Sequence, residues 1–289
     1  MSVAPAFPSY LVTPEMLHDA LNNRQRRSGE HRIIPLSAAW FLSSDGRRGI
    51  DCFRRKRIPN SIFCDLDSLA DKTSAFPQML PSADQFASVL GSLGITPGDA
   101  VVIYDTEELG IFSAPRVAWL FKTFGHERVY ILNNFRLWVK LGLPVETGEM
   151  TVPESIIYPT PSRDDSRVIL FEELRDLVLN GHVPHSVQIL DSRSAKFWTR
   201  GPPAESTPVT GHIPHSIHLP LPDILDPNNK TILPSPQLRK IFQAKGIKHE
   251  RTLVTTCGAG ITAAVVEVAL EEAGYGTKMS RRLFDGSWR

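Results

Sequence analysis

Short apolar runs alternate with longer stretches of helical periodicity along most of the chain. Apolar runs at Val101–Tyr104 and Val129–Leu132 flank a stretch at Ser113–Phe124 whose apolar residues repeat with the spacing of a helix. Later in the chain, the run Leu253–Thr255 precedes an alanine-rich stretch that ends at Gly274. Short strands that alternate with helices are typical of a mostly parallel sheet covered by helices on both faces. We therefore predict an α/β fold.

The two halves of the chain repeat the same landmarks in the same order, which indicates an internal duplication. The matching pairs are Leu36-Ser37 with Leu190-Asp191, Ile58–Ile62 with Ile213–Ile217, Val101–Asp105 with Leu253–Cys257, and Gly125 with Gly274. Prolines interrupt any periodicity between these halves, at Pro153, Pro159 and Pro161. The sequence thus predicts tandem domains at residues 9–147 and 167–289, joined by a linker at 148–166.

One position of the repeat carries a nucleophile in the second half alone. Cys257 follows an apolar run and precedes two glycines, Gly258 and Gly260, and then a helical stretch with Thr262 at the expected N-cap. The amide groups and dipole of a helix N-terminus favour a thiolate over a thiol. Asp105 stands at the matching position of the first half, so we expect that half to have a structural role. The alternative is a small buried apolar cysteine, which is the commoner use of this residue.

Composition narrows the remaining classes. The 289 residues are 42% hydrophobic and 22% charged, with a net charge of +1, as in a soluble globular protein. This charge gives no reason to expect direct nucleic-acid binding, and the basic run Arg54–Arg57 is interpreted as a solvated surface. No apolar stretch is long enough for a membrane helix. The first ten residues resemble neither a secretory signal nor a transit peptide.

The cysteines indicate a reducing compartment. Cys52, Cys64 and Cys257 are too few and too scattered for a disulfide framework or a metal site, so we expect no metal and no cofactor. Cys64 lies in the apolar segment Ile62–Leu66 and is predicted to be an inert thiol in a buried strand. Cys52 lies in a charged segment and is predicted to be in an exposed loop. The expected location is the cytoplasm, with the mitochondrion as the alternative.

Several motifs in order resemble the two-domain rhodanese-type sulfurtransferases, and the 3-mercaptopyruvate branch most. They are Tyr104-Asp105, Ser113–Arg116, Met79-Leu80-Pro81, Gly211–Pro214, the loop Cys257–Thr262, and Asp285–Trp288. The resemblance covers nearly the whole chain and implies tandem rhodanese-like domains. Thiosulfate enzymes of the family have basic residues after the cysteine, whereas Gly258 and Ala259 are neutral. The resemblance therefore favours 3-mercaptopyruvate as the donor.

The activity that this resemblance implies is sulfur transfer through a persulfide on Cys257. The persulfide loop would consist of Gly258, Ala259, Gly260, Ile261 and Thr262. A thiol then accepts the sulfur: thioredoxin, glutathione or a sulfur-carrier protein of tRNA thiolation, as implied for fungal relatives.

The resemblance also places the donor's carboxylate beside arginines that follow Asp191-Ser192-Arg193. Here Lys196 stands where one arginine is expected, and it supplies a point charge without the bidentate fork. Arg200 is the expected substitute for the other. We expect Arg193 to make a structural ion pair at the domain edge, with an accessory role at the donor as the alternative.

A proton relay known in the family is incomplete in this sequence. The family has a serine in the cysteine loop, a histidine before Met-Leu-Pro, and an aspartate in the first domain. This chain keeps the aspartate as Asp67, but Ala259 and Gln78 stand at the other two positions. Water and Thr262 are then the expected proton source, and a lower rate or a different donor are the alternatives.

A cysteine in a loop of this kind also suggests three other functions. A cysteine phosphatase requires an arginine about six positions after the cysteine, where this chain has Ala263. Thiosulfate sulfurtransferase is the nearer alternative, and a rhodanese-like binding module with weak catalysis is the non-enzymatic one. Relatives continue with a helix after Asp285–Trp288, whereas this sequence ends at Arg289, so we expect apolar surface to be exposed beside the sheet.

Overall fold

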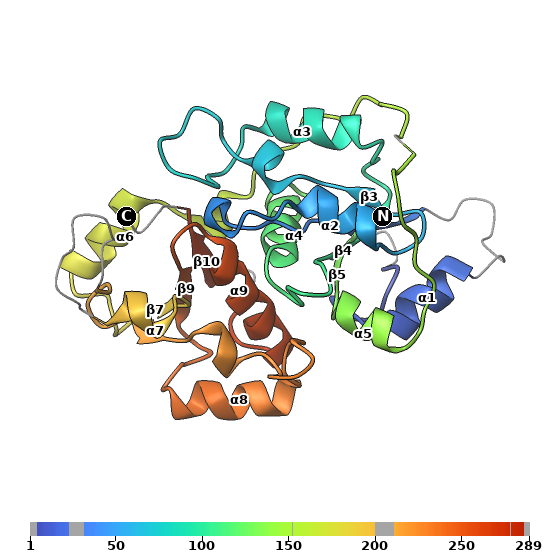
Figure 1. Cartoon of the computed structure of the whole chain (residues 1–289). Helices are drawn as coiled ribbons and strands as arrows, with labels where there is room; N and C mark the ends of the chain where they lie inside the picture. The colour runs from blue at the N-terminus through green and yellow to red at the C-terminus, as the bar shows by residue number, and fades with distance from the viewer. Residues whose placement is uncertain (1–4, 23–31, 152, 200–210, 278, 286–289) are drawn as a thin grey trace. The chain divides into compact units, whose positions relative to one another are not determined.

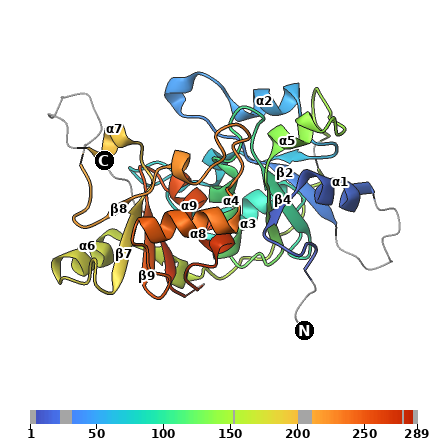
Figure 2. The same cartoon turned by 90° about the horizontal axis from the view of Figure 1, so that it is seen from below.

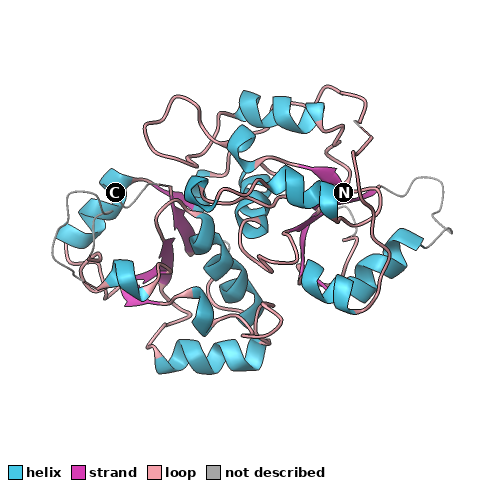
Figure 3. Cartoon of the chain, in the orientation of Figure 1, coloured by secondary structure: helices cyan, strands magenta, loops and turns pink. Residues whose placement is uncertain are grey.

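The structure is a computed structural model that describes residues 5–22, 32–151, 153–199, 211–277 and 279–285 (Figure 1). Strands alternate with helices along this part of the chain (Figure 3). The chain forms two compact units. The first unit consists of Met1–Ala70, Pro81–Arg163 and Asn228–Thr231, and the second of Asp71–Leu80, Asp164–Pro227 and Ile232–Arg289.

The first unit contains a five-stranded parallel sheet in the order β1-β5-β4-β2-β3. Its strands are β1 (Leu11–Val12), β2 (Ile33–Ser37), β3 (Ile62–Phe63), β4 (Ala100–Tyr104) and β5 (Val129–Leu132). Its α-helices are α1 (Pro14–Asn22), α2 (Gly49–Arg55), α3 (Ala83–Ser92), α4 (Ala114–Thr123) and α5 (Phe135–Lys140). Short 3₁₀-helices occur at Ser43–Asp45 and Leu66–Leu69.

The second unit repeats this topology, with the strand order β6-β10-β9-β7-β8 and parallel pairing throughout. Its strands are β6 (Val168–Ile169), β7 (Val187–Asp191), β8 (Ile217–His218), β9 (Thr252–Thr256) and β10 (Arg281–Phe284). Its α-helices are α6 (Phe171–Leu179), α7 (Ala195–Trp198), α8 (Ser235–Ala244) and α9 (Ile261–Ala273), with 3₁₀-helices at Asp165–Arg167 and Leu221–Asp223. The predicted α/β fold with tandem parallel sheets is confirmed.

Equivalent strands of the two units pair in equivalent registers. Ser37 of β2 lies opposite Tyr104 at the end of β4. Asp191 of β7 lies opposite Thr256 at the end of β9 in the same way. The residues that follow β4 and β9 are Asp105 and Cys257, so the duplication deduced from the sequence holds at the point where the chemistry is expected.

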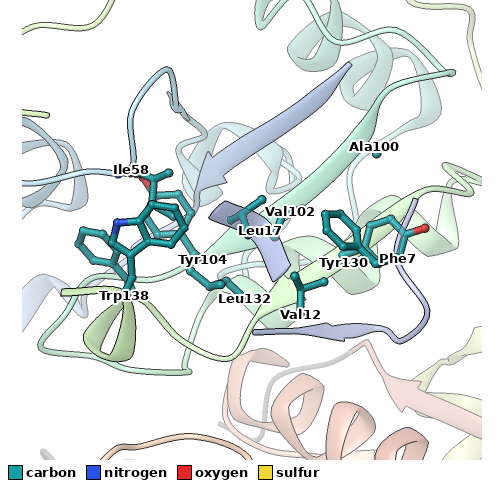
Figure 4. Packing of buried hydrophobic residues seen from close by; sticks show 11 residues of the cluster. Phe7, Val12, Leu17, Ile58, Ala100, Val102, Tyr104, Tyr130, Leu132 and Trp138 are labelled. Carbon is teal, nitrogen blue, oxygen red and sulfur yellow. Dashed lines mark hydrogen bonds between the residues drawn. The ribbon is translucent and has the colours of Figure 1, made fainter. Parts of the chain in front are cut away.

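Each sheet buries apolar side chains on both faces because β-strand residues alternate in direction. In the first unit, Val102 and Tyr104 of β4 pack with Leu17 of α1 and Trp138 of α5 (Figure 4). Burying one such side chain stabilises the fold by about 1.5–3 kcal/mol. The run of β4 is buried throughout, as its uninterrupted apolar sequence predicts for an inner parallel strand.

In the second unit, α6 covers one face of the sheet and α9 the other. Leu174 of α6 belongs to a buried cluster with Ile189 of β7 and Val254 of β9. The next residue along β9, Thr255, points the opposite way and donates from its hydroxyl to the carboxylate of Glu267 on α9 at 3.0 Å. Helix α8 packs against α9 (Figures 1 and 2). Strand β9 is therefore held between two helical layers.

The segment after the first sheet is docked on the first unit. Ile156 N–H donates to the carbonyl oxygen of Gly91 in α3 at 2.9 Å. A Cβ atom at Gly91 would lie 2.4 Å from the carbonyl oxygen of Ile156, so this close passage requires glycine. Two residues later, the Tyr158 hydroxyl lies 3.0 Å from Nδ1 of buried His126. The predicted domain and linker boundaries at 147–148 and 166–167 stay predictions.

The expectation for Cys52 was wrong. Cys52 lies in α2, with only 5% of its surface exposed, and Arg55 Nη2 donates to its sulfur at 2.9 Å. The helix buries Cys52 and Phe53 and directs its arginines outward, so a charged segment can still bury a cysteine. Cys64 follows β3 and is buried, as predicted. Burial raises the pKa of its thiol to about 12, and a protonated thiol is a poor nucleophile.

Candidate active site

Cys257 lies directly after β9, at the carboxyl end of the middle strand of the second sheet. Ligands of parallel α/β sheets characteristically bind beyond this edge. Only 4% of the Cys257 surface is exposed. The four residues Cys257–Gly260, called here the Cys257 loop, connect β9 to α9. The predicted sequence of strand, glycine-containing loop and helix is confirmed.

The N-terminus of helix α9 follows the Cys257 loop and favours a negative charge there. The N-cap of this helix differs from the predicted one. The N-cap is Gly260, with φ of 75° and ψ of −4°, and Thr262 is the second residue of the helix. Such a left-handed conformation favours glycine over residues that carry a Cβ atom. The prediction that Thr262 caps the helix was therefore wrong. The N–H groups of the first helical turn have no acceptor within the helix, so they can stabilise a negative sulfur.

Ser192 contacts both ends of the Cys257 loop. Its backbone N–H and its hydroxyl both donate to the carbonyl oxygen of Thr256, at 3.0 and 3.2 Å. Its Oγ also lies 2.7 Å from Oγ1 of Thr262. Thr256 precedes the loop and Thr262 follows it, while Ser192 itself comes directly after β7. The sequence reasoning missed Ser192, because only the register of β7 against β9 brings it to the loop.

The equivalent loop of the first unit bonds an acidic side chain through its backbone amides. The carboxylate of Asp105 accepts hydrogen bonds from the N–H groups of Phe112, Ser113 and Ala114 at 2.8, 3.1 and 3.0 Å, and from the Ser113 hydroxyl. Burial raises the pKa of Asp105, and these hydrogen bonds oppose that rise. The start of α4 thus directs backbone amides at an acidic side chain. Cys257 occupies the same position in the second unit.

Glu267 fastens α9 to the strand that leads into Cys257. Besides the bond from Thr255, its carboxylate lies 3.9 Å from the guanidinium of Arg281 on β10. Arg281 also donates to Glu271, one turn along α9, at 3.2 Å. Burial raises the pKa of Glu267, and the positive charge of Arg281 opposes that rise. These contacts bind the helix to two neighbouring strands.

The three basic residues named as candidates for contact with the donor differ in their environment. Lys196 lies on α7 with its side chain exposed to solvent. Arg193 is buried: its Nη2 donates to the Asp191 carboxylate at 2.6 Å and to the Gly211 carbonyl oxygen at 2.7 Å. Arg200 lies outside the described residues. Of the two described side chains, Lys196 is the one that can approach a donor from solvent.

Two of the three relay positions, the retained Asp67 and the substituted Gln78, belong to different units. Asp67 lies in the 3₁₀-helix of the first unit, where its carboxylate accepts a hydrogen bond from the Trp40 indole N–H at 2.8 Å. Gln78 belongs to the second unit, is 5% exposed, and has a positive φ of 61°. The segment that contains Gln78 is attached to the second sheet's unit by a hydrogen bond, in which Leu80 N–H donates to the Asp285 carboxylate at 3.1 Å.

An aromatic stack stabilises α7, and sequence reasoning missed it. Trp198 stacks on His212 at 3.9 Å and on His218 at 4.8 Å between ring centroids. Nδ1 of His212 lies 3.1 Å from the Trp198 carbonyl oxygen. His218 donates from Nε2 to the Arg193 carbonyl oxygen at 2.8 Å. No regular spacing links these three residues, so no periodicity could have predicted the stack.

Within the described ranges no group of three or more histidine, cysteine, aspartate or glutamate side chains is arranged to hold a metal ion. Among the helices described, none combines the length and apolar character needed to cross a membrane.

Comparisons with known proteins agree with this geometry. The rhodanese-like domain family matches residues 171–289. A Schizosaccharomyces pombe protein named "Probable 3-mercaptopyruvate sulfurtransferase" is 34% identical over 266 residues, which cover 91% of this chain and 87% of that protein. The thiosulfate sulfurtransferase TUM1 of Saccharomyces cerevisiae is 33% identical over 273 residues, with 89% and 88% covered.

A solved structure extends the likeness to three dimensions. The yeast mitochondrial complex I sub-stoichiometric sulfur transferase subunit, seen by cryo-EM, has a TM-score of 0.84 and 29% identity to this chain. The match covers 97% of this chain and 95% of that one. Relatives of this identity and coverage share both the duplicated fold and the chain order of its elements. The chain therefore belongs to the two-domain rhodanese-type sulfurtransferases, the family of the 3-mercaptopyruvate and thiosulfate enzymes.

Proposed function

We propose that this sulfurtransferase moves sulfane sulfur from 3-mercaptopyruvate to a thiol acceptor through a persulfide on Cys257, and releases pyruvate. The observation that carries the proposal is the contrast between two equivalent positions. In the first unit the loop amides hold the carboxylate of Asp105. In the second unit the same position, at the start of the 13-residue helix α9, holds the sulfur of Cys257, which can form a bond to the donor's sulfur and is released again when the acceptor takes that outer sulfur.

The chemistry has two steps. The Cys257 thiolate attacks the donor's sulfur, a sulfur–sulfur bond forms, and the carbon–sulfur bond of the donor breaks. The electron pair of that bond leaves as pyruvate enolate, which takes a proton and becomes pyruvate. An acceptor thiolate then attacks the outer sulfur of the persulfide and releases the Cys257 thiolate. In the proposed mechanism the loop and first-turn amides stabilise a negative sulfur in each state, and fixed dipoles of this kind need no reorganisation.

The residues around the loop support a keto-acid donor. Gly258 and Ala259 are neutral, and a Cβ atom at Gly258 would meet no other atom within 4 Å. The loop thus leaves room without adding the positive charges that a sulfonate-like donor would favour. Exposed Lys196 supplies a charge for the donor's carboxylate, and Arg200 is proposed as its companion. Asp67 and Arg193 are kept in supporting roles, since Arg193 is already engaged by Asp191.

Thiosulfate is the second candidate donor, because one of the relatives is named a thiosulfate sulfurtransferase. The two donors are distinguished by the ratio of their kcat/KM values with a common thiol acceptor. We expect the higher value with 3-mercaptopyruvate, together with one pyruvate per acceptor persulfide formed. A higher value with thiosulfate would reverse the donor assignment. Absence of turnover with both would leave a rhodanese-like binding module as the better description.

The acceptor is proposed to be a thiol of thioredoxin, glutathione or a sulfur-carrier protein. Participation in a larger protein system is supported by the yeast neighbour, which is a sulfur transferase subunit of mitochondrial complex I. That neighbour also supports a mitochondrial location, alongside the cytoplasmic one predicted from the sequence. Comparing kcat/KM for these three acceptor classes at a fixed donor concentration ranks them directly.

Lys196→Ala is expected to raise the KM for 3-mercaptopyruvate about 5- to 10-fold and to leave kcat within about 2-fold, because the loss of one charge-assisted contact weakens donor binding. Steady-state kinetics at low and high salt check this, since added salt should shrink the difference. Lys240→Ala removes an exposed lysine of α8 in the same unit and serves as the matched control. Equal KM values for both variants would exclude Lys196 from donor binding.

A further inference from the structure

The Cys257 loop is preceded by Thr256 and followed by the helical turn that contains Thr262. The side chain of Ser192 contacts both of these residues. The Ser192 hydroxyl lies 3.2 Å from the Thr256 carbonyl oxygen and 2.7 Å from Thr262 Oγ1. A carbonyl oxygen can only accept, so the Ser192 proton goes to Thr256, and the Ser192 oxygen accepts from Thr262 at the same time. One buried hydroxyl, 3% exposed as a residue, can thus hold both ends together.

The first unit supplies an internal comparison for this contact. Ala38 is the counterpart of Ser192, and its N–H donates to the Tyr104 carbonyl oxygen at 2.9 Å. The equivalent bond from Ser192 N–H to Thr256 measures 3.0 Å. The backbone bond that joins the strand ends is therefore common to both units. The hydroxyl contacts occur only in the unit that carries the cysteine, so the fold itself does not require them.

The Cys257 loop is rich in glycine. Two of its four residues, Gly258 and Gly260, are glycines, which have the widest choice of backbone conformations. A Cβ atom at Gly258 would meet nothing within 4 Å apart from its chain neighbours. Small displacements at a reacting centre are costly, since about 1 Å of misplacement can lower a rate by about 10²-fold. A contact that ties the loop's ends would keep the sulfur aligned with the first-turn amides of α9.

We propose that Ser192 is a positioning residue that ties the two ends of the Cys257 loop through Thr256 and Thr262, and so holds the sulfur against the amide groups that stabilise it. The inference rests on the proposed role of Cys257 as the sulfur carrier. Ser192 acts through Thr262 and the loop backbone, and the donor's carboxylate is bound elsewhere. Its removal should therefore affect the chemical step much more than donor binding.

The test is a double-mutant cycle on the full chain, with 3-mercaptopyruvate and a thiol acceptor. Ser192→Ala and Thr262→Val are each expected to lower kcat about 10-fold or more, with the KM for the donor within about 2-fold. Because the two hydroxyls act as one unit, the double variant should lose no more than the worse single one. Thr262→Ser keeps the hydroxyl and should retain most of the kcat.

Ser216→Ala is the matched control, since Ser216 also donates from its hydroxyl to a backbone carbonyl oxygen of the second unit, that of Ile213 at 2.5 Å. Its kcat should stay at the wild-type value while its melting temperature falls as much as that of Ser192→Ala. An unchanged kcat in folded Ser192→Ala, or losses that multiply in the double variant, would overturn the proposal. If the wild-type protein fails to form a persulfide, the proposed function fails first, so the two failures are distinguishable.

Discussion

Cys257→Ser is expected to lower kcat/KM for sulfur transfer by about 10³-fold or more, to the background of the assay. A serine hydroxyl cannot form a sulfur–sulfur bond, and the remaining groups supply no other sulfur carrier. The loss should be the same with 3-mercaptopyruvate and thiosulfate, because both donors deliver sulfur to the same atom. The measurement is initial-rate kinetics with each donor, together with circular dichroism to confirm folding.

The matched control is Cys52→Ala, which removes a thiol that lies in α2 of the first unit. This variant should retain turnover, since Cys52 is buried beside Arg55 within a helix and does not belong to the Cys257 loop. Residual turnover in Cys257→Ser at a tenth of the wild-type rate would show that sulfur passes directly from donor to acceptor. Such a result would reduce Cys257 to a binding residue.

Arg193→Ala is expected to lower the free energy of unfolding by about 3–5 kcal/mol, because it leaves the buried carboxylate of Asp191 without its counter-charge. Asp191 is 1% exposed and accepts from Arg193 Nε at 3.0 Å and from Nη2 at 2.6 Å. The variant also loses the bond that Arg193 makes to the Gly211 carbonyl oxygen. Urea unfolding followed by circular dichroism measures the change.

Arg175→Ala provides the comparison, since Arg175 pairs with Asp176 on the exposed surface of α6 and should contribute little. Where folded Arg193→Ala protein remains, its KM for the donor separates the structural role from the accessory one. A stable Arg193→Ala variant with a raised KM would contradict the structural assignment and favour contact with the donor.

The periodicity of the chain was sufficient to predict the duplicated parallel sheets, because parallel strands are short and uniformly apolar. The matching segments Ile58–Ile62 and Ile213–Ile217 lead into β3 and β8, which occupy equivalent sheet edges. The position of Cys257 at a strand end followed from the same pattern. These features depend on local sequence, and the repeat supplies the pattern of strands and helices twice.

Features that depend on long-range contacts could not be predicted. The segment Asp71–Leu80 lies between elements of the first sheet, yet belongs to the second unit, where Leu80 N–H reaches Asp285. Ser192 approaches Thr262 only because β7 and β9 are neighbours in register. Thr262 was expected to cap α9, but the left-handed backbone at Gly260 starts the helix earlier. A glycine in a loop has too many conformations for sequence alone to choose among them.

The central claim is that Cys257 carries the transferred sulfur, and intact-mass measurement of the protein tests it most directly. The protein is incubated with 3-mercaptopyruvate without an acceptor thiol, desalted and weighed, with peptide mapping of the adduct. A gain of one sulfur atom on the Cys257 peptide, absent in Cys257→Ser and removed by an added thiol, is the predicted result. An unmodified mass with stoichiometric pyruvate release, or an adduct on Cys52 or Cys64, would contradict the account.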